Sequence, residues 1–146
     1  MKYFAVIDTN VIVSALLSAR KEKESNPMKV IAYVFLGKVR LVYNEEILEE
    51  YKDVLHRKKF GFDPILVDKV ISEIRRIGIC SESMEVDDVF PDPDDAVFFE
   101  VAMEFKTLED STYLVTGNTK HFPAHPIVVT PADFVKIIEN SHERSE

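Results

Sequence analysis

Four short segments of the 146-residue sequence carry acidic or amide side chains beside apolar runs. These segments are 8–10, 45–50, 92–95 and the residues around Asn118. Carboxylates that gather in a partly desolvated place repel one another and lose hydration, so such a cluster needs cations to offset its charge. If the fold brings the four segments together, they would form a site for a divalent cation. Their position therefore depends on the elements that carry them.

The apolar pattern predicts alternating strands and helices. The run Tyr3–Ile7 does not alternate with polar residues, as expected of a strand that is buried on both faces. Further strands are predicted at Val39–Tyr43, 113–115 and 126–129, with weak signals at Ile79–Cys80 and 84–86. Helices are predicted over 11–18 (with Thr9 or Asn10 as N-cap), 27–37, 45–57, 64–77, 94–105 and 131–140. This order predicts an α/β fold, a three-layer α/β/α sandwich around a parallel sheet.

A parallel sheet would bring the acidic segments to one edge. Ligands of such sheets lie outside the carboxyl ends of the strands. Asp8 follows the first predicted strand, and Asn118 follows the strand at 113–115. The helices that begin at Glu45 and near Asp92 should start on the same side, because a covering helix begins where its preceding strand ends. We therefore expect the four segments to meet.

Helical phase distinguishes the glutamates at the start of the third helix. Its apolar residues form one stripe: Ile47, Leu48, Tyr51, Val54 and Leu55. At about 100° per residue, Glu50 borders this stripe, whereas Glu49 lies nearly opposite to it. Glu45 and Glu46 suit the helix N-terminus, where carboxylates favour the helix dipole. Glu50 is therefore the candidate for the acidic site.

The aspartates of segment 92–95 have a structural interpretation as well. Asp92 would cap a helix, Pro93 would take its first position, and Asp95 would complete an arrangement like a capping box. Capping alone does not require three aspartates in four residues. The apolar stripe of the following helix places Asp94 and Asp95 about equally close to its edge, so periodicity leaves the choice between them open.

Taken together, four sequence pieces resemble the PIN-domain nucleases, especially the VapC-like toxins of toxin–antitoxin pairs. The pieces are Asp8-Thr9-Asn10 after a strand, Glu50-Tyr51-Lys52-Asp53-Val54-Leu55, Asp92-Pro93-Asp94-Asp95 before a helix, and Val115-Thr116-Gly117-Asn118-Thr119-Lys120-His121-Phe122. They occur in the order of the family and span nearly the whole chain.

The resemblance implies a role for individual residues. It makes Asp8, Glu50 and Asp95 the catalytic and metal-binding acids, and it selects Asp95 over Asp94. It also implies supporting roles for Asn10, Asp92, Thr116 and Asn118. Family members often carry a fourth acid where this chain has Asn118, which removes one negative charge.

The function implied by the resemblance is hydrolysis of RNA phosphodiester bonds with Mg²⁺ or Mn²⁺. Both ions favour oxygen ligands, and Mg²⁺ retains several waters in its coordination shell. The implied partners are an RNA substrate, a small antitoxin protein and a second copy of the chain in a homodimer. Two alternatives remain open: an RNA-processing nuclease without an antitoxin, and a non-catalytic module that binds RNA or protein.

Two other kinds of enzyme are disfavoured. A phosphotransferase of the haloacid-dehalogenase kind would want a second aspartate where this chain has Asn10. Zinc hydrolysis is disfavoured because His56, His121, His125 and His142 show no metal-ligand spacing with one another or with Cys80.

Composition bounds the remaining expectations. The length suits one domain over 1–140 followed by a polar tail at 141–146, and neither a signal peptide nor a membrane span is expected. A single cysteine excludes an intrachain disulfide and agrees with a cytoplasmic location. The formal net charge of −8 is unusual for a protein that binds nucleic acid. Basic residues form three short groups at 20–23, 57–59 and 75–76, and we interpret these groups as solvated helix ends.

Overall fold

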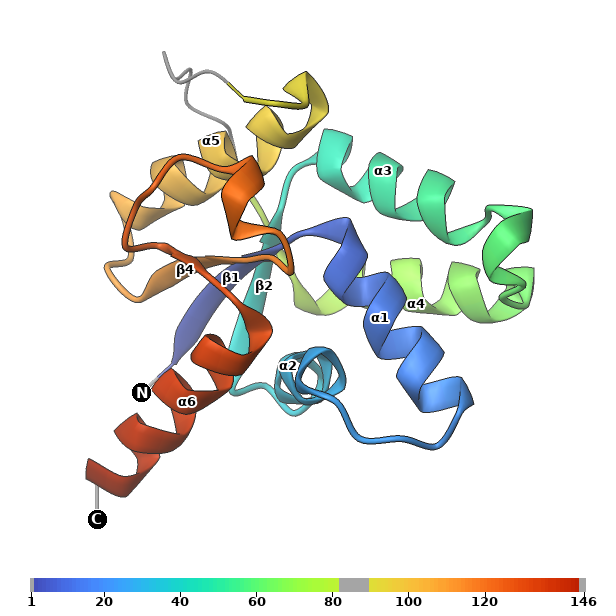
Figure 1. Cartoon of the computed structure of the whole chain (residues 1–146), viewed down its shortest axis with the longest axis horizontal. Helices are drawn as coiled ribbons and strands as arrows, with labels where there is room; N and C mark the ends of the chain where they lie inside the picture. Colours follow the sequence, from blue (N-terminus) through green and yellow to red (C-terminus); the bar gives the residue numbers. More distant parts are fainter. Residues whose placement is uncertain (1, 82–89, 145–146) are drawn as a thin grey trace.

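A parallel sheet of five strands, in the order β3-β2-β1-β4-β5, forms the centre of the computed structural model (Figure 1). The structure describes residues 2–81 and 90–144, the last three by their backbone alone. The strands are β1 (Tyr3–Ile7), β2 (Val39–Tyr43), β3 (Ile79–Cys80), β4 (Thr112–Val115) and β5 (Val128–Val129). The predicted α/β fold with a central parallel sheet is therefore confirmed.

Helices cover both faces of this sheet. In the described residues they are α1 (Thr9–Arg20), α2 (Asn26–Phe35), α3 (Glu45–Leu55), α4 (Pro64–Ile77), α5 (Ala96–Lys106) and α6 (Pro131–Arg144). The chain moves from β1 to β2 to β3 in one direction, and then returns to β4 on the other side of β1. Because such crossovers are right-handed, α1 to α4 lie on one face of the sheet and α5 lies on the other (Figure 1). No helix of the described part is long and apolar enough to cross a membrane.

The core explains why the strands do not alternate in sequence. Ala5, Val6 and Ile7 of β1 have no exposed surface, since helices pack on both of their faces. From α5, Phe98 and Val101 are also completely buried. This rigid centre fixes the positions at which the chain leaves the strands.

The boundaries of several elements differ from the prediction. The first helix begins at Thr9, so the N-cap residue is Asp8 rather than Thr9 or Asn10. The reason is the abrupt turn at the end of β1, where Asp8 is still extended (φ −62°, ψ 143°). The last helix continues to Arg144, further than predicted and into the segment expected to be a polar tail. The strand signal at 84–86 lies outside the described residues.

One buried hydrogen bond joins α3 to the central strand. The hydroxyl of Tyr51 donates to the carbonyl of Ile7, the residue that precedes Asp8. Tyr51 is completely buried, and its ring lies 6.4 Å from the ring of Phe98. The helix that carries Glu50 is thereby attached to the strand that carries Asp8.

Replacing Tyr51 by phenylalanine should lower the free energy of unfolding by about 1–2 kcal/mol, because it leaves a buried carbonyl without its donor. Urea denaturation followed by circular dichroism measures this change. Tyr113→Phe is the matched control. It removes the same hydroxyl group, but the hydroxyl of Tyr113 makes no hydrogen bond with any described residue. Equal stability of Tyr51→Phe and the wild-type protein would contradict the proposed attachment.

Candidate active site

The site begins where the strand order of the sheet reverses. The strands β1 and β4 are neighbours, but the chain leaves β1 toward β2 and reaches β4 only after β3. Ligands of open parallel sheets bind at such a switch point, outside the carboxyl ends of the strands. Asp8 and Thr116 directly follow these two strands. Their side chains therefore meet at the position where this topology favours a ligand.

Asp8 is held by a short chain of hydrogen bonds. The residue is 7% exposed, and its Oδ2 atom accepts a hydrogen bond of 2.8 Å from the buried hydroxyl of Thr116. That hydroxyl accepts in turn from the backbone N–H of Asn118 at 3.0 Å. The carboxylate makes no capping bond to α1, although Asp8 occupies the N-cap position. One carboxylate oxygen thus has a fixed partner at the switch point.

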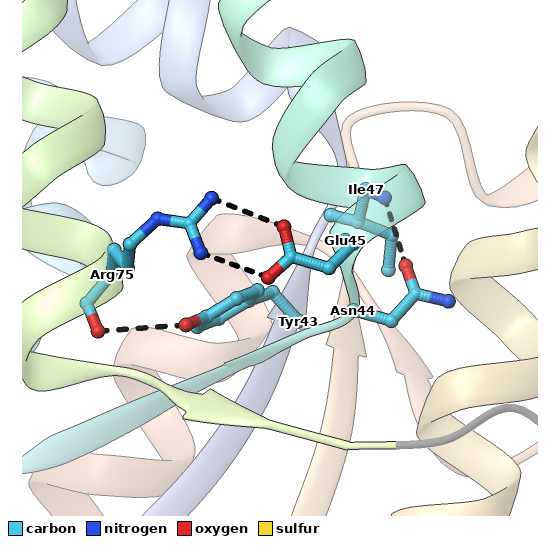
Figure 2. A network of polar contacts seen from close by, with 5 residues as sticks. All are labelled: Tyr43, Asn44, Glu45, Ile47 and Arg75. Atoms are coloured by element: carbon cyan, nitrogen blue, oxygen red, sulfur yellow. Dashed lines mark hydrogen bonds and ion pairs between the residues drawn. The ribbon is translucent and has the colours of Figure 1, made fainter.

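The start of α3 is fixed by a polar network, which Figure 2 shows. The Oδ1 atom of Asn44 caps the helix by accepting from the N–H of Ile47 at 2.8 Å. Arg75 of α4 donates to both carboxylate oxygens of Glu45, at 2.9 and 3.0 Å. The hydroxyl of Tyr43 donates to the carbonyl of Arg75 at 3.4 Å. These contacts set the rotation of α3 and hence the direction of its later side chains.

Glu50 turns toward the first turn of α1. Its Oε2 atom accepts a hydrogen bond from the hydroxyl of Thr9, which is buried. Glu50 is half-buried, whereas Glu46 and Glu49 are exposed and Glu45 is paired with Arg75. This burial agrees with the helical phase of α3. Two adjacent residues, Asp8 and Thr9, therefore link β4 and α3 at one place.

The structure separates the three aspartates that precede α5. Asp92 is exposed and its Oδ1 atom caps the 3₁₀ turn η2 (Pro93–Asp95) by accepting from the N–H of Asp94 at 3.0 Å. The side chain of Asp95 makes no capping bond, so the expected capping box is wrong; η2 precedes the helix, and α5 begins only at Ala96. Asp94 is exposed, while the side chain of Asp95 is 17% exposed and lies 3.6 Å from Nδ1 of His121.

The three partly buried carboxylates raise one another's pKa. Burial raises the pKa of Asp8, and the charge of Glu50 raises it further, against the hydrogen bond from Thr116. Burial is also the main cause of the raised pKa of Glu50. Among the other effects that raise this pKa, the charge of Asp95 is the largest. Burial and the charge of Asp8 raise the pKa of Asp95 to about 6. Each carboxylate thus carries a negative charge that its surroundings do not fully compensate.

An acidic cleft adjoins this centre. It has a volume of about 280 Å³ and lies between the N-terminal half of α3 and the segment formed by η2 and the start of α5. Its lining residues are Glu46, Glu50, Pro93, Asp94, Ala96, Val97 and Glu100. Glu50 belongs both to the cleft and to the cluster with Asp8 and Asp95. The cleft therefore gives solvent and small ligands access to the edge of the acidic centre.

The other predicted site residues lie at the periphery. Asn10 is exposed, and its Oδ1 atom accepts from the N–H of Gly117 at 3.4 Å. Asn118 is exposed and contributes its backbone N–H. From the sequence, Thr9 was predicted only as a possible N-cap, and neither its hydrogen bond to Glu50 nor the position of His121 beside Asp95 was predicted. Thr9 and His121 both lie in the sequence pieces that resemble the PIN-domain nucleases, and this position was the only indication that they belong to the site.

The donor atoms suit a hard divalent cation. Asp8, Glu50 and Asp95 offer carboxylate oxygens with uncompensated charge, and Mg²⁺ is commonly held by one or two carboxylates with waters completing its shell. Within the described part of the chain, no three His, Cys, Asp or Glu side chains lie close enough to share an ion in this conformation. The residues therefore fit an ion bound by one or two carboxylates, not a closed cage of protein ligands.

The fold and this centre define a class: α/β proteins with an acidic site at the switch point of a parallel sheet. A sequence model described as "PIN domain" matches residues 5–120. The chain belongs to the PIN-domain family, whose members are generally nucleases. Its fold is therefore of the nuclease type. A search of the curated proteins and a search of the solved structures gave no significant match.

The raised pKa of Asp95 predicts how stability changes with pH. Between the ordinary value of 3.8 and the folded value of about 6, the folded protein binds more protons than the unfolded chain. Stability should therefore fall as the pH rises through this window. Asp95→Asn removes this effect and should raise the free energy of unfolding by about 1 kcal/mol at neutral pH, an amount reduced by solvent screening.

Urea denaturation in EDTA, at neutral pH and near pH 4, measures this difference. The gain in stability from Asp95→Asn should vanish near pH 4, because the carboxyl of Asp95 in the folded wild-type protein is then protonated and neutral. Asp94→Asn removes the same charge from the exposed neighbour and should change stability less. A variant Asp95→Asn that is less stable than wild type at neutral pH would contradict the assignment of uncompensated charge.

Proposed function

We propose that this protein is a metal-dependent ribonuclease that hydrolyses RNA phosphodiester bonds. The observation that carries the proposal is the convergence of Asp8, Glu50 and Asp95 from three separate segments at the switch point of the sheet. Leaving three carboxylates in mutual repulsion is costly for folding. A purely structural role would not require such a cluster of carboxylates, whereas a cation-dependent reaction does.

The residues of the site have distinct tasks in this proposal. Among Asp8, Glu50 and Asp95, one or two carboxylates would hold Mg²⁺ or Mn²⁺, which would offset charge on the scissile phosphate and lower the pKa of an attacking water. Thr116 orients Asp8, and Thr9 orients Glu50, each by a hydroxyl that donates to the carboxylate. Asn10 links the start of α1 to the segment after β4 through Gly117. His121 lies beside Asp95, with 3.6 Å between its Nδ1 atom and the carboxylate of Asp95.

The finer parts of the proposal rest on the resemblance of the sequence pieces to VapC-like toxins. They are RNA as the substrate, a small antitoxin as the protein partner, a homodimer as the assembly and the cytoplasm as the location. The surface offers support for a protein partner. Four large apolar side chains at the end of α2 and the start of α4 are exposed: Phe35, Leu36, Ile65 and Leu66. Phe35 and Ile65 line one surface hollow, and adjoining exposed apolar side chains are typical of interaction surfaces.

Cleavage of a labelled single-stranded RNA in Mg²⁺ or Mn²⁺ tests the proposed reaction. We expect activity in the wild-type protein. Asp8→Asn and Asp95→Asn should each lose at least about 100-fold of this activity, because each variant removes a carboxylate that supports the cation at the reacting phosphate. Asp94→Asn is the matched control and should lose much less activity. EDTA should abolish cleavage.

Equal activity of wild type, Asp8→Asn and Asp95→Asn would indicate a contaminating nuclease and would defeat the proposal. Cleavage of single-stranded DNA without cleavage of RNA would refute the substrate. Binding of RNA that survives Asp8→Asn, without cleavage by any form of the protein, would favour a non-catalytic module.

Titration with Mn²⁺ tests the cation directly, with no substrate present. The rise in melting temperature on adding Mn²⁺ reports binding to the folded protein. Asp8→Asn should weaken binding by more than about tenfold, since loss of even a neighbour of a metal ligand has effects of this size. Glu49→Gln is the control, because Glu49 lies on the same helix as Glu50 and is exposed. The same midpoint in Asp8→Asn and wild type would rule out Asp8 as a ligand.

A further inference from the structure

Two basic groups that are far apart in the sequence meet in the structure. Arg20 ends α1, and Arg57, Lys58 and Lys59 follow α3. The Nη1 atom of Arg20 donates to the carbonyl of Phe60 at 2.8 Å, which joins the end of α1 to the 3₁₀ turn η1 (Lys58–Phe60). Arg20, Arg57, Lys58 and Lys59 are all exposed. We call these four residues the basic patch.

Aromatic rings hold two of these cations in place. The guanidinium carbon of Arg20 lies 5.1 Å from the centre of the Phe62 ring, and Nζ of Lys59 lies 5.1 Å from the centre of the Phe60 ring. The two rings stack at 5.9 Å with an angle of 18° between their planes. Fixed cations lose less conformational entropy when they bind an anion than free side chains do. The basic patch is therefore preorganised.

No acidic side chain of the described residues neutralises the charges of the patch. None of its four residues forms an ion pair with any residue that the structure describes. The third basic group behaves differently, because Arg75 pairs with Glu45 and Arg76 pairs with Glu73. In a chain of net charge −8, a phosphate backbone is repelled overall and needs a local positive surface. The basic patch is such a surface, although Glu22 and Glu24 lie in the loop that follows Arg20.

The patch and the acidic centre lie along the same two helices. Helix α3 extends from Glu50 for about 7.5 Å to its last residue, Leu55, and Arg57 follows two residues later. Arg57 is close enough for its charge to lower the pKa of Glu50. Helix α1 likewise runs from Thr9, which holds Glu50, to Arg20 in the patch. A strand with one phosphate at the acidic centre could thus reach the patch with neighbouring phosphates.

We propose that the basic patch binds the sugar–phosphate backbone of a single-stranded nucleic acid on one side of the cleaved bond. This inference rests on the proposed function, since it assigns a second contact to the same substrate. A single strand suits the geometry because Asp8 is recessed and a flexible backbone can bend into the site. Positive grooves beside aromatic rings are typical of proteins that bind single strands without sequence preference.

Binding of a fluorescent RNA of about twelve nucleotides, measured by anisotropy in EDTA, tests the patch without cleavage. Lys58→Gln/Lys59→Gln should weaken binding by about tenfold. It should also reduce the slope of log K against log salt by about 1.4, because each of the two lost phosphate contacts contributes about 0.7. Arg57→Gln is an independent single variant and should reduce the slope by about half that amount. Lys29→Gln/Lys136→Gln removes the same charge from exposed positions on α2 and α6, and should bind like wild type.

The outcomes separate this inference from the proposed function. Patch-dependent binding by a protein that cleaves no RNA would uphold the patch and refute the nuclease. Cleavage by wild type, together with equal binding of Lys58→Gln/Lys59→Gln and Lys29→Gln/Lys136→Gln, would refute the patch alone. An equal loss of affinity in both double variants would show that only net charge matters, and would also overturn the inference.

Discussion

The carboxylate of Asp8 is the group on which the arrangement of the site depends. It is buried at the end of the central strand, and the hydroxyl of Thr116 is its fixed partner across the switch point. Burying a carboxylate is costly, so every neighbouring element must be placed accurately for this position to be tolerated. The strand β4 supplies the hydrogen bond, and Tyr51 fastens α3 to the carbonyl just before Asp8. The same helix then presents Glu50 to Thr9, so the second acid follows from the placement of the first.

The fold was predictable because its causes are local in sequence. Uninterrupted apolar runs indicate strands that are buried on both faces, and caps such as Asn44 mark where helices begin. The convergence of acidic segments also followed, since parallel strands share one carboxyl edge. The exact start of α1 did not follow. Thr9 and Asn10 are good capping residues by type, but the chain turns immediately after β1, and this tertiary constraint gives the N-cap position to Asp8.

The choice between Asp94 and Asp95 shows where sequence periodicity reaches its limit. Both lie near the edge of the same apolar stripe, and the difference arises because η2 is a 3₁₀ turn rather than the first turn of α5. That turn leaves Asp94 exposed and directs Asp95 toward His121, a residue 26 positions later in the chain. Helical phase assumes one continuous helix, so it could not resolve this point. The hydrogen bond from Thr9 to Glu50 likewise joins two helices and has no signature within either of them.

The distribution of charge reconciles a net charge of −8 with the proposed nucleic-acid substrate. The acidic centre repels phosphate unless a cation is present, so it provides little binding energy of its own in the metal-free state. A substrate would then be held elsewhere, and the basic patch lies at the C-terminal ends of α1, which follows Asp8, and of α3, which carries Glu50. Affinity and reactivity would in this way be divided between two surfaces of opposite sign. A phosphate would be drawn into the acidic centre only when the cation is bound, which couples cleavage to metal while leaving capture of the strand independent of it.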